Sequence, residues 1–363
     1  MAAFGINVFD FGAKGDGITD DTAAIQAAID YTARRGGGRI QFPFTPAGYR
    51  IASPGREEYE GRPVRAQLII PPGQHNIMLE GEMPCKLLYS YQVRPLSAVK
   101  ANFKPTVFGN MPALNTFLFS DWAAPEEHDS TARPWSIIAA PEGNANKGHF
   151  SVSIFSIANL EFRVPMDTEK MYPTQSAVNL QNVARCNVSN SQFCLNENVG
   201  DTLLNKELQR NPCHTVGFMG PGDQNDNVVI SNCAVQGFKY GFVLGEHVVA
   251  DYLYVHNNEE AIVFHDCSHL SVINHVVAQH NRCILATSRG QLFGHIPGPC
   301  NVIIGSVNFE DGHRLKPEIS QMKYGIYDEE NRLAGELCWF EPWGDQEFEV
   351  VGAQGMKVRH LAN

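Results

Sequence analysis

The sequence predicts an all-β fold in which the chain winds into a parallel β-helix, with a helix capping its N-terminal end and long loop insertions. Strand-like units recur about every twenty residues in the middle of the chain. Glycine and proline are abundant, at 32 and 21 of 363 residues, and only 18% of residues are charged. This turn-rich composition and this period are typical of a solenoid, which grows by adding coils.

The opening block, residues 8–30, predicts a strand, a tight turn and then an amphipathic helix. Glycines at positions 12, 15 and 17 allow the chain to reverse sharply after the strand. Thr19 or Asp20 is a suitable N-cap for the helix. We expect the helix to cover the open end of the β-helix, whose first coil would otherwise expose edge strands.

The remainder of this block fits the same interpretation. One apolar stripe at helical spacing consists of Ile25, Ala28, Ile29 and Thr32. The glycines at 36–38 end the helix, and residues 39–42 alternate like a strand. The acidic side chains near the turn are expected to serve as caps and turn residues rather than in chemistry; they are Asp16, Asp20 and Asp21.

The repeat is clearest in three units that begin at Asn227, His247 and His269, with steps of 20 and 22 residues. Related segments begin at Asn76, Ile157, Asn182 and Asn301. Asparagine tolerates the left-handed backbone conformation of a corner, and stacked amides can hydrogen-bond from coil to coil. We therefore expect asparagines at the corners of the coils.

Long irregular insertions separate the coils, at residues 53–65, 91–133, 165–176 and 200–225. Loops of this length in a compact fold usually carry function. The repeat is lost after His313. The sequence thus predicts a β-helix with its N-terminal cap over residues 1–312, and a C-terminal β extension over residues 313–363 that serves as an end cap or a subunit contact.

Charge and hydropathy exclude several classes of partner. The formal net charge of −11 argues against nucleic acid and anionic membrane surfaces, and mildly against a polyanionic substrate unless a basic groove overrides it. No apolar run is long enough to span a bilayer. The N-terminus lacks a basic start and an apolar signal core, so a cytoplasmic location is expected, or a secreted one if a signal was removed.

The nine cysteines agree with a reducing compartment, because their number is odd and several fall in strand-like runs. We expect buried, reduced thiols at Cys186, Cys233, Cys267 and Cys283. No CxxC pair is present, so no metal site is predicted.

The repeat also predicts which side chains lie on adjacent rungs, about 4.8 Å apart. Steps of 20 and then 22 residues align Lys239 with Glu259 and Asn281. They also align Tyr240 with Glu260 and Arg282. Such residues form either a solvated ladder of charges, which stabilises weakly, or the wall of a sugar-binding site.

The density of ionisable residues in these coils favours a site. Histidines stand at 247, 256, 265, 269, 275 and 280, and Tyr240, Tyr252 and Tyr254 can offer flat faces to sugar rings. The candidate catalytic residues are Glu260, Asp266, Glu259 and Asp251. The candidate substrate-binding residues are Arg282, Lys239, His265, His280 and Tyr240.

Hydrolysis or transfer at a glycosidic bond needs a protonated carboxyl and a second carboxylate about 5 to 10 Å away. Glu259 or Glu260 with Asp266 or Asp251 can supply the pair, and Arg282 beside Glu260 would lower the pKa of that carboxyl. A lyase instead needs a base and cations beside a uronate, for which Lys239, Arg282, His280 and His256 are candidates.

The opening block, Val8–Asp30 with 36–43 and 48–51, resembles that of the right-handed parallel β-helix proteins of the pectate-lyase and polygalacturonase superfamily. Most of these proteins act on polysaccharides. The Asn-Thr-Asp, Gly-His-Gly and Arg-Ile-Lys signatures of polygalacturonases are absent, and Asp-Asp occurs only at Asp20-Asp21. Inulin fructotransferases and phage tailspike enzymes share this architecture with weak sequence signals. The resemblance to them implies a homo-oligomer, with a trimer favoured and sites between subunits.

The sequence therefore predicts a carbohydrate-active enzyme, a glycoside hydrolase or glycosyl transferase, that needs no cofactor. A polysaccharide lyase, with Ca²⁺ as an added requirement, is the first alternative. A non-catalytic glycan-binding or structural β-helix trimer is the second. The four tryptophans fit a sugar platform as well as a core or interface role; they are Trp122, Trp135, Trp339 and Trp343.

Overall fold

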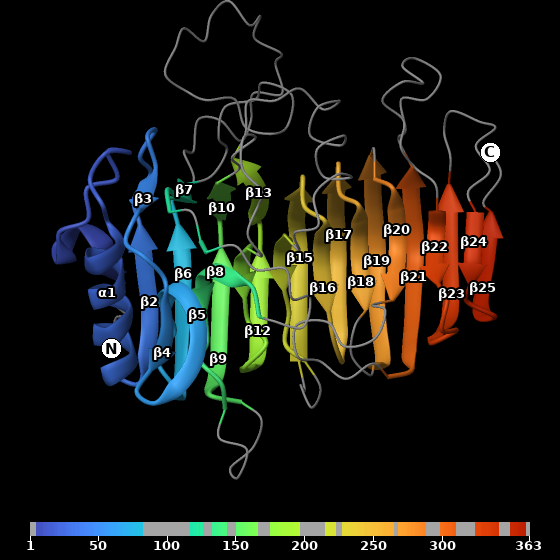
Figure 1. Cartoon of the computed structure of the whole chain (residues 1–363), viewed down its shortest axis with the longest axis horizontal. Helices are drawn as coiled ribbons and strands as arrows, with labels where there is room; N and C mark the ends of the chain where they lie inside the picture. The colour runs from blue at the N-terminus through green and yellow to red at the C-terminus, as the bar shows by residue number, and fades with distance from the viewer. Residues whose placement is uncertain are drawn as a thin grey trace, which may run out of the picture.

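The computed structural model describes residues 5–82, 116–122, 124–125, 133–143, 150–165, 175–196, 215–222, 227–264, 268–279, 281–287, 298–309, 324–340 and 349–360. In this part of the chain, parallel strands stack along one long axis in nearly their order in the sequence, from the N-terminal to the C-terminal end (Figure 1). Helix α1 (Thr22–Arg34) lies at the N-terminal end of the stack.

Two sheets carry the fold. The long sheet follows the order β1 (Ile6–Asn7), β2 (Gly37–Phe42), β6 (Gly73–Gly81), β9 (Val152–Ala158), β12 (Val183–Ser189), β15 (Asn227–Gln236), β17 (Val248–His256), β19 (Ser268–Gln279), β21 (Cys300–Phe309), β23 (Leu333–Phe340) and β25 (Gly355–His360). A branch of the same sheet contains β3 (Tyr49–Ile51), β7 (Thr116–Ser120), β10 (Leu160–Pro165) and β13 (Gln192–Asn196).

The short sheet follows the order β24 (Glu349–Gly352), β22 (Tyr324–Asp328), β20 (Cys283–Thr287), β18 (Glu260–Phe264), β16 (Tyr240–Leu244), β14 (Val216–Met219), β11 (Gln175–Asn179), β8 (Trp135–Ala139), β5 (Arg62–Ile69) and β4 (Arg56–Tyr59). The pairing of β4 with β5 is antiparallel, so residues 53–65, expected to be an irregular insertion, instead contain β4 and the start of β5. The predicted fold class, a right-handed parallel β-helix with an N-terminal helix, is confirmed.

Corners in the left-handed backbone conformation divide several coils of the long sheet into two faces. Asn159, Asn190 and Asn232 occupy these corners with φ of 57°, 49° and 52°. Their amides form a ladder, in which Asn190 Nδ2 donates to Asn159 Oδ1 at 3.2 Å and Asn232 Nδ2 donates to Asn190 Oδ1 at 2.8 Å. The expected asparagine corners are thus present, and the next coil places Tyr252 at the same position with φ 53°.

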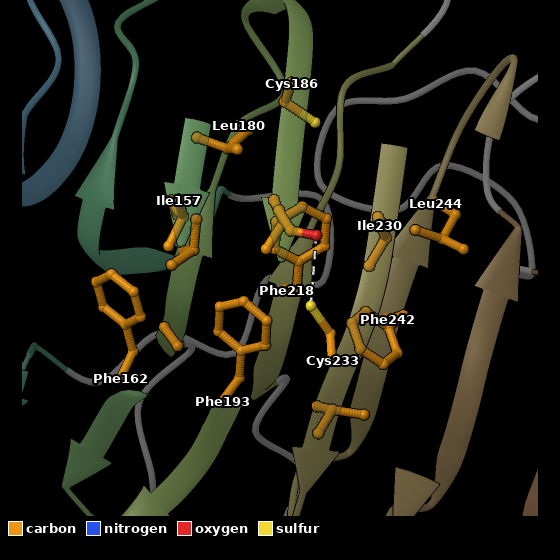
Figure 2. Close-up of a cluster of buried hydrophobic side chains, with 14 of the residues drawn as sticks. Ile157, Phe162, Leu180, Cys186, Phe193, Phe218, Ile230, Cys233, Phe242 and Leu244 are labelled. Carbon is orange, nitrogen blue, oxygen red and sulfur yellow. Dashed lines mark hydrogen bonds between the residues drawn. The ribbon is translucent and has the colours of Figure 1, made fainter. Parts of the chain in front are cut away.

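The core is a column of apolar side chains enclosed by the coils. Figure 2 shows Phe162, Phe193, Phe218 and Phe242 from neighbouring strands facing one another inside the solenoid. The rings of Phe162 and Phe193 are stacked, with centroids 6.0 Å apart and an interplanar angle of 17°. Burying large aromatic rings on successive rungs is the main stabilising contribution that such a narrow fold can make.

The opening block folds largely as predicted. The buried face of α1 includes Ile25, Ala28, Ile29 and Thr32, and residues 37–42 form β2. Residues 8–11 form a 3₁₀ turn (η1, Val8–Phe11) rather than a strand, and the helix begins after Asp21 rather than after Thr19 or Asp20. No described helix combines the length and the apolar character that a membrane-crossing segment requires.

The acidic residues of this block serve the fold, as expected. Asp16 Oδ1 accepts hydrogen bonds from the Ile18 and Thr19 amides, and Asp21 accepts from the Lys14 and Gly15 amides. These bonds hold the turn that precedes the helix.

Strands beyond residue 313 extend both sheets. β22 pairs with β20 in the short sheet, and β23 pairs with β21 in the long sheet. The segment expected to form a C-terminal extension thus adds further rungs to the same two sheets, and its role as an end cap or a subunit contact stays a prediction.

Candidate functional site

The predicted cluster on the short sheet is assembled in part. Tyr240 on β16 pairs with Glu260 at the start of β18, as the 20-residue step predicts. The Lys239 ammonium lies 5.6 Å from the Tyr240 ring centroid. Glu260 and Tyr240 are half-buried on the outer face of the sheet. The structure therefore brings an aromatic ring and a carboxylate together on adjacent rungs.

The predicted alignment of the next rung is wrong by one residue. Glu260 pairs with Cys283, and Arg282 instead bonds to Glu259, with 3.0 Å between Nη1 and Oε1. Asn281 likewise stacks on Asn258 rather than Glu259, since the Asn258 amide donates to Asn281 Oδ1 at 3.0 Å. The step between these coils is 23 residues rather than 22, because the corner contains one more residue than the repeat suggests.

The carboxylates proposed as an acid–base pair are not gathered on one face. Asp251 is exposed on β17 of the long sheet, whereas Glu260 begins β18 of the short sheet and Glu259 directly precedes it. Glu259 is paired with Arg282 in a partly exposed ion pair. Asp266, His265 and His280 lie outside the described residues.

A second polar set occupies the outer face of the long sheet beyond the corners. The sequence singled out only two of its members, His256 as a base for a lyase and Tyr254 as a flat face for a sugar ring. Its members stand on consecutive rungs and are buried or half-buried, although strand alternation directs them away from the core. We call this set the outer polar stripe: Glu161 and Arg163 on β10, Gln192 and Cys194 on β13, Gln236 on β15, Tyr254 and His256 on β17, and Gln279 on β19. Five rungs span about 19 Å.

The β10 end of the outer polar stripe is a buried ion pair. Arg163 Nε lies 2.6 Å from Glu161 Oε1, and their side chains are 6% and 0% exposed. The Arg163 guanidinium also lies 3.9 Å from the centroid of the Phe117 ring. Two buried atoms of the pair, Glu161 Oε2 and Arg163 Nη2, have no hydrogen-bond partner in the described part of the chain. Buried polar atoms of this kind usually mark a place for water or a ligand.

Cys194 adjoins this pair, with its Sγ 3.1 Å from Glu161 Oε1. Burial, and then the charge of Glu161, raises the pKa of the Cys194 thiol. The thiol is therefore a neutral donor to the carboxylate rather than a nucleophile.

The β17 end of the outer polar stripe carries groups suited to proton transfer. The rings of Tyr254 and His256 have centroids 6.1 Å apart, and Tyr254 Oη donates to Gln279 Oε1 on the next rung. Gln236 and Gln279 flank His256 on the two neighbouring strands. A histidine and a tyrosine this close can act as a base and an acid toward one substrate.

The sequence did contain a signal for this stripe. Gln236, His256 and Gln279 occupy one repeat position at steps of 20 and 23 residues, and Tyr254 with His256 shows the i, i+2 spacing of one strand face. The pattern did not group these residues because the corner residue, Tyr252 on β17, turns the second half of the strand onto another face.

The described tryptophans, considered above as a sugar platform, do not form an open site. Trp122 and Trp135 pack edge to face with centroids 5.2 Å apart, and Trp135 is only 5% exposed. Trp339 packs against the core, and Trp343 lies outside the described residues. No group of three or more potential metal-ligating side chains occurs in the described ranges.

Comparison with known proteins finds matches to one segment at the N-terminal end of the chain. Residues 5–59 match the model of the family described as "Rhamnogalacturonase A/epimerase, pectate lyase-like". Mannuronan C5-epimerase AlgE5 of Azotobacter vinelandii is 54% identical over 55 residues, which cover 15% of this chain and 5% of that protein. Alginate lyase 7 of the same organism is also 54% identical over 55 residues, covering 15% of this chain and 6% of that protein.

Solved structures align along nearly the whole chain at low identity. ORF18 of Geobacillus virus E2 has a TM-score of 0.45 and 11% identity, covering 98% of this chain and 59% of that chain. The A-module of Azotobacter vinelandii epimerase AlgE4 has a TM-score of 0.34 and 14% identity, covering 99% and 100%.

The matched segment contains the N-terminal cap and the first strands, but no member of the outer polar stripe and no predicted site residue. No catalytic role is therefore carried over from these relatives. The match and the fold together confirm the predicted resemblance of this chain to the parallel β-helix proteins of the pectate-lyase superfamily.

Proposed function

We propose that this chain is a carbohydrate-active enzyme that removes the proton beside a uronate carboxylate in a polysaccharide, as a lyase or an epimerase. The observation that carries the proposal is the Tyr254–His256 pair, flanked by the amides of Gln236 and Gln279. The names of the relatives that match the N-terminal segment, epimerase and lyase, agree with this class of reaction.

In the proposed reaction, His256 takes the proton from the carbon beside the carboxylate. The electron pair left behind is stabilised in the carboxylate, to which the amide N–H groups of Gln236 and Gln279 can donate. In a lyase, the pair forms a carbon–carbon double bond as the adjacent carbon–oxygen bond breaks, and Tyr254 gives its proton to the leaving oxygen. In an epimerase, Tyr254 instead returns a proton to the opposite face of the same carbon.

Hydrolysis or transfer at Glu260 is the second candidate, favoured by the half-buried Glu260 beside the Tyr240 ring. This reaction needs a second carboxyl. Asp266 would have to supply it, since Asp251 is on the other sheet and Glu259 is bonded to Arg282. Assembly as a homotrimer also stays a proposal, which light scattering of the purified chain tests.

The experiment is incubation with alginate, polygalacturonate and neutral β-glucans, with mass spectrometry, ultraviolet absorbance and proton magnetic resonance of the products. The proposal expects products from a uronate polymer without added water, with a new conjugated double bond or an inverted carbon, and their loss in His256→Gln. Products heavier by one water that persist in His256→Gln and vanish in Glu260→Gln would overturn it in favour of the second candidate.

A further inference from the structure

The asparagine ladder at the corners of the long sheet is interrupted by an aromatic residue. Asn159, Asn190 and Asn232 occupy consecutive corners, and the register then places Tyr252, followed by His275, at the same position. Asparagine tolerates the left-handed conformation of this corner, whereas a bulky aromatic residue there is strained.

Packing does not account for the tyrosine. Its side chain is 45% exposed, so it contributes little to the core, and its φ is 53°. A strained conformation in a well-ordered coil is retained where the side chain itself serves a purpose.

The Tyr252 ring is held as part of a pair. Its centroid lies 5.4 Å from that of His275, with an interplanar angle of 34°. His275 Nδ1 lies 2.6 Å from Ser306 Oγ on the next strand, which fixes the imidazole. Two rings thus contact each other across adjacent rungs, with the exposed side chains of Asp251 and Asn274 next to them in the chain.

This pair adjoins the outer polar stripe. Tyr252, at the corner of β17, is two residues before Tyr254 and four before His256, so their Cα atoms are at most about 7 and 13 Å away. A sugar ring stacked on Tyr252 would therefore belong to the same bound chain as a unit beside His256.

We propose that Tyr252 and His275 form a stacking subsite for a pyranose ring, which holds the polysaccharide along β17 one or two units from the reacting sugar. The aromatic faces cover the apolar side of the ring, and Asp251 and Asn274 bond to its hydroxyl groups. This subsite rests on the proposed function for its role in turnover, but its binding of a glycan can be measured without turnover.

The test is affinity electrophoresis of the full chain in gels containing alginate, polygalacturonate or hydroxyethyl cellulose. Tyr252→Asn is the informative variant, because asparagine relieves the strained corner and can extend the amide ladder. Its midpoint of urea denaturation should be equal to or higher than that of the original chain. Its dissociation constant for the retained polymer should rise about 5- to 10-fold.

The matched control is Tyr31→Asn, which removes another exposed tyrosine, on α1, and should leave retention unchanged. Unchanged retention of Tyr252→Asn, or no retention of the original chain by any of the three polymers, would overturn the subsite. So would a loss of the oligomer in Tyr252→Asn at the same concentration, because Tyr252 would then be a subunit contact. If retention behaves as expected but His256→Gln keeps full turnover, the subsite stands and the proposed reaction centre fails.

Discussion

Arg163 Nε and Glu161 Oε1 lie 2.6 Å apart on the outer face of β10, in an ion pair almost fully removed from solvent. Both charged groups are removed from water, so each is stabilised by the other and by its contacts with Phe117 and Cys194. The pair forms the β10 end of the outer polar stripe. A change that breaks the pair should therefore also lower the stability of the fold.

Replacing Glu161 by Gln should destabilise the protein by about 3–5 kcal/mol, because the Arg163 charge would be left buried without its partner. Urea denaturation measures the change. Glu259→Gln is the matched control, since its partner Arg282 is 38% exposed and such pairs contribute about 0–1 kcal/mol. Equal effects of the two variants would show that the Glu161 pair is not buried in solution.

Tyr254→Phe and His256→Gln should each lower kcat on a uronate polymer by about 100-fold or more, while the denaturation midpoint changes little. The reason is that both side chains transfer protons and neither belongs to the apolar column inside the coils. Steady-state rates and urea curves of the same preparations check this. Full activity in both variants would remove the outer polar stripe from the mechanism.

The stacked asparagines in the interior, Asn258 and Asn281, should contribute more to the stability of the fold than the asparagine ladder at the corners. Asn281 accepts from the Asn258 backbone amide and side chain and donates to the Val255 carbonyl, all in the interior. Asn281→Ala leaves these groups unsatisfied and should cost about 3 kcal/mol. Asn190→Gly removes one rung of the corner ladder but keeps a residue that adopts positive φ, so it should cost about 1 kcal/mol or less. Thermal unfolding of the two variants compares them directly.

Asp20 should make the N-terminal cap sensitive to acid. Burial alone would raise the pKa of Asp20, but hydrogen bonds from Ser53, Thr22 and Ala52 outweigh it and lower the pKa from 3.8 to about 2. A carboxyl with a lowered folded pKa stabilises the fold above pH 3.8, and this contribution is lost as the pH falls toward 2.

Asp20→Ala should therefore lower the free energy of unfolding near neutral pH by about 1 kcal/mol or less, since solvent screens this exposed group. The difference from the original chain should vanish near pH 2. Urea curves across this range test the sign; a difference that grows on acidification would contradict the assignment.

The fold could be predicted from the sequence because the patterns that specify it are local and repeat along the chain. Glycines in the opening turn, the stripe containing Ile25 and Ile29, and asparagine at the corners each specify one step of a coil. The pairing of Tyr240 with Glu260 followed from the 20-residue step alone.

The site was harder to predict, because the length of each corner varies and decides which side chains become neighbours. One additional residue before Arg282 moves its guanidinium from Glu260 to Glu259, since side chains alternate with a period of two. The burial of Glu161 and Arg163 on an outer face cannot be read from alternation, which predicts exposure for both.

The central claim is that Tyr254 and His256 remove a proton from a uronate, and solvent exchange tests it most directly. The chain is incubated with alginate or polygalacturonate in deuterated water, and the polymer is examined by proton magnetic resonance. The account predicts products of proton abstraction, namely deuterium at the carbon beside the carboxylate or a new double bond, in the original chain and in neither Tyr254→Phe nor His256→Gln. A cleaved polymer with that proton intact and no double bond, from the original chain and both variants alike, would contradict it.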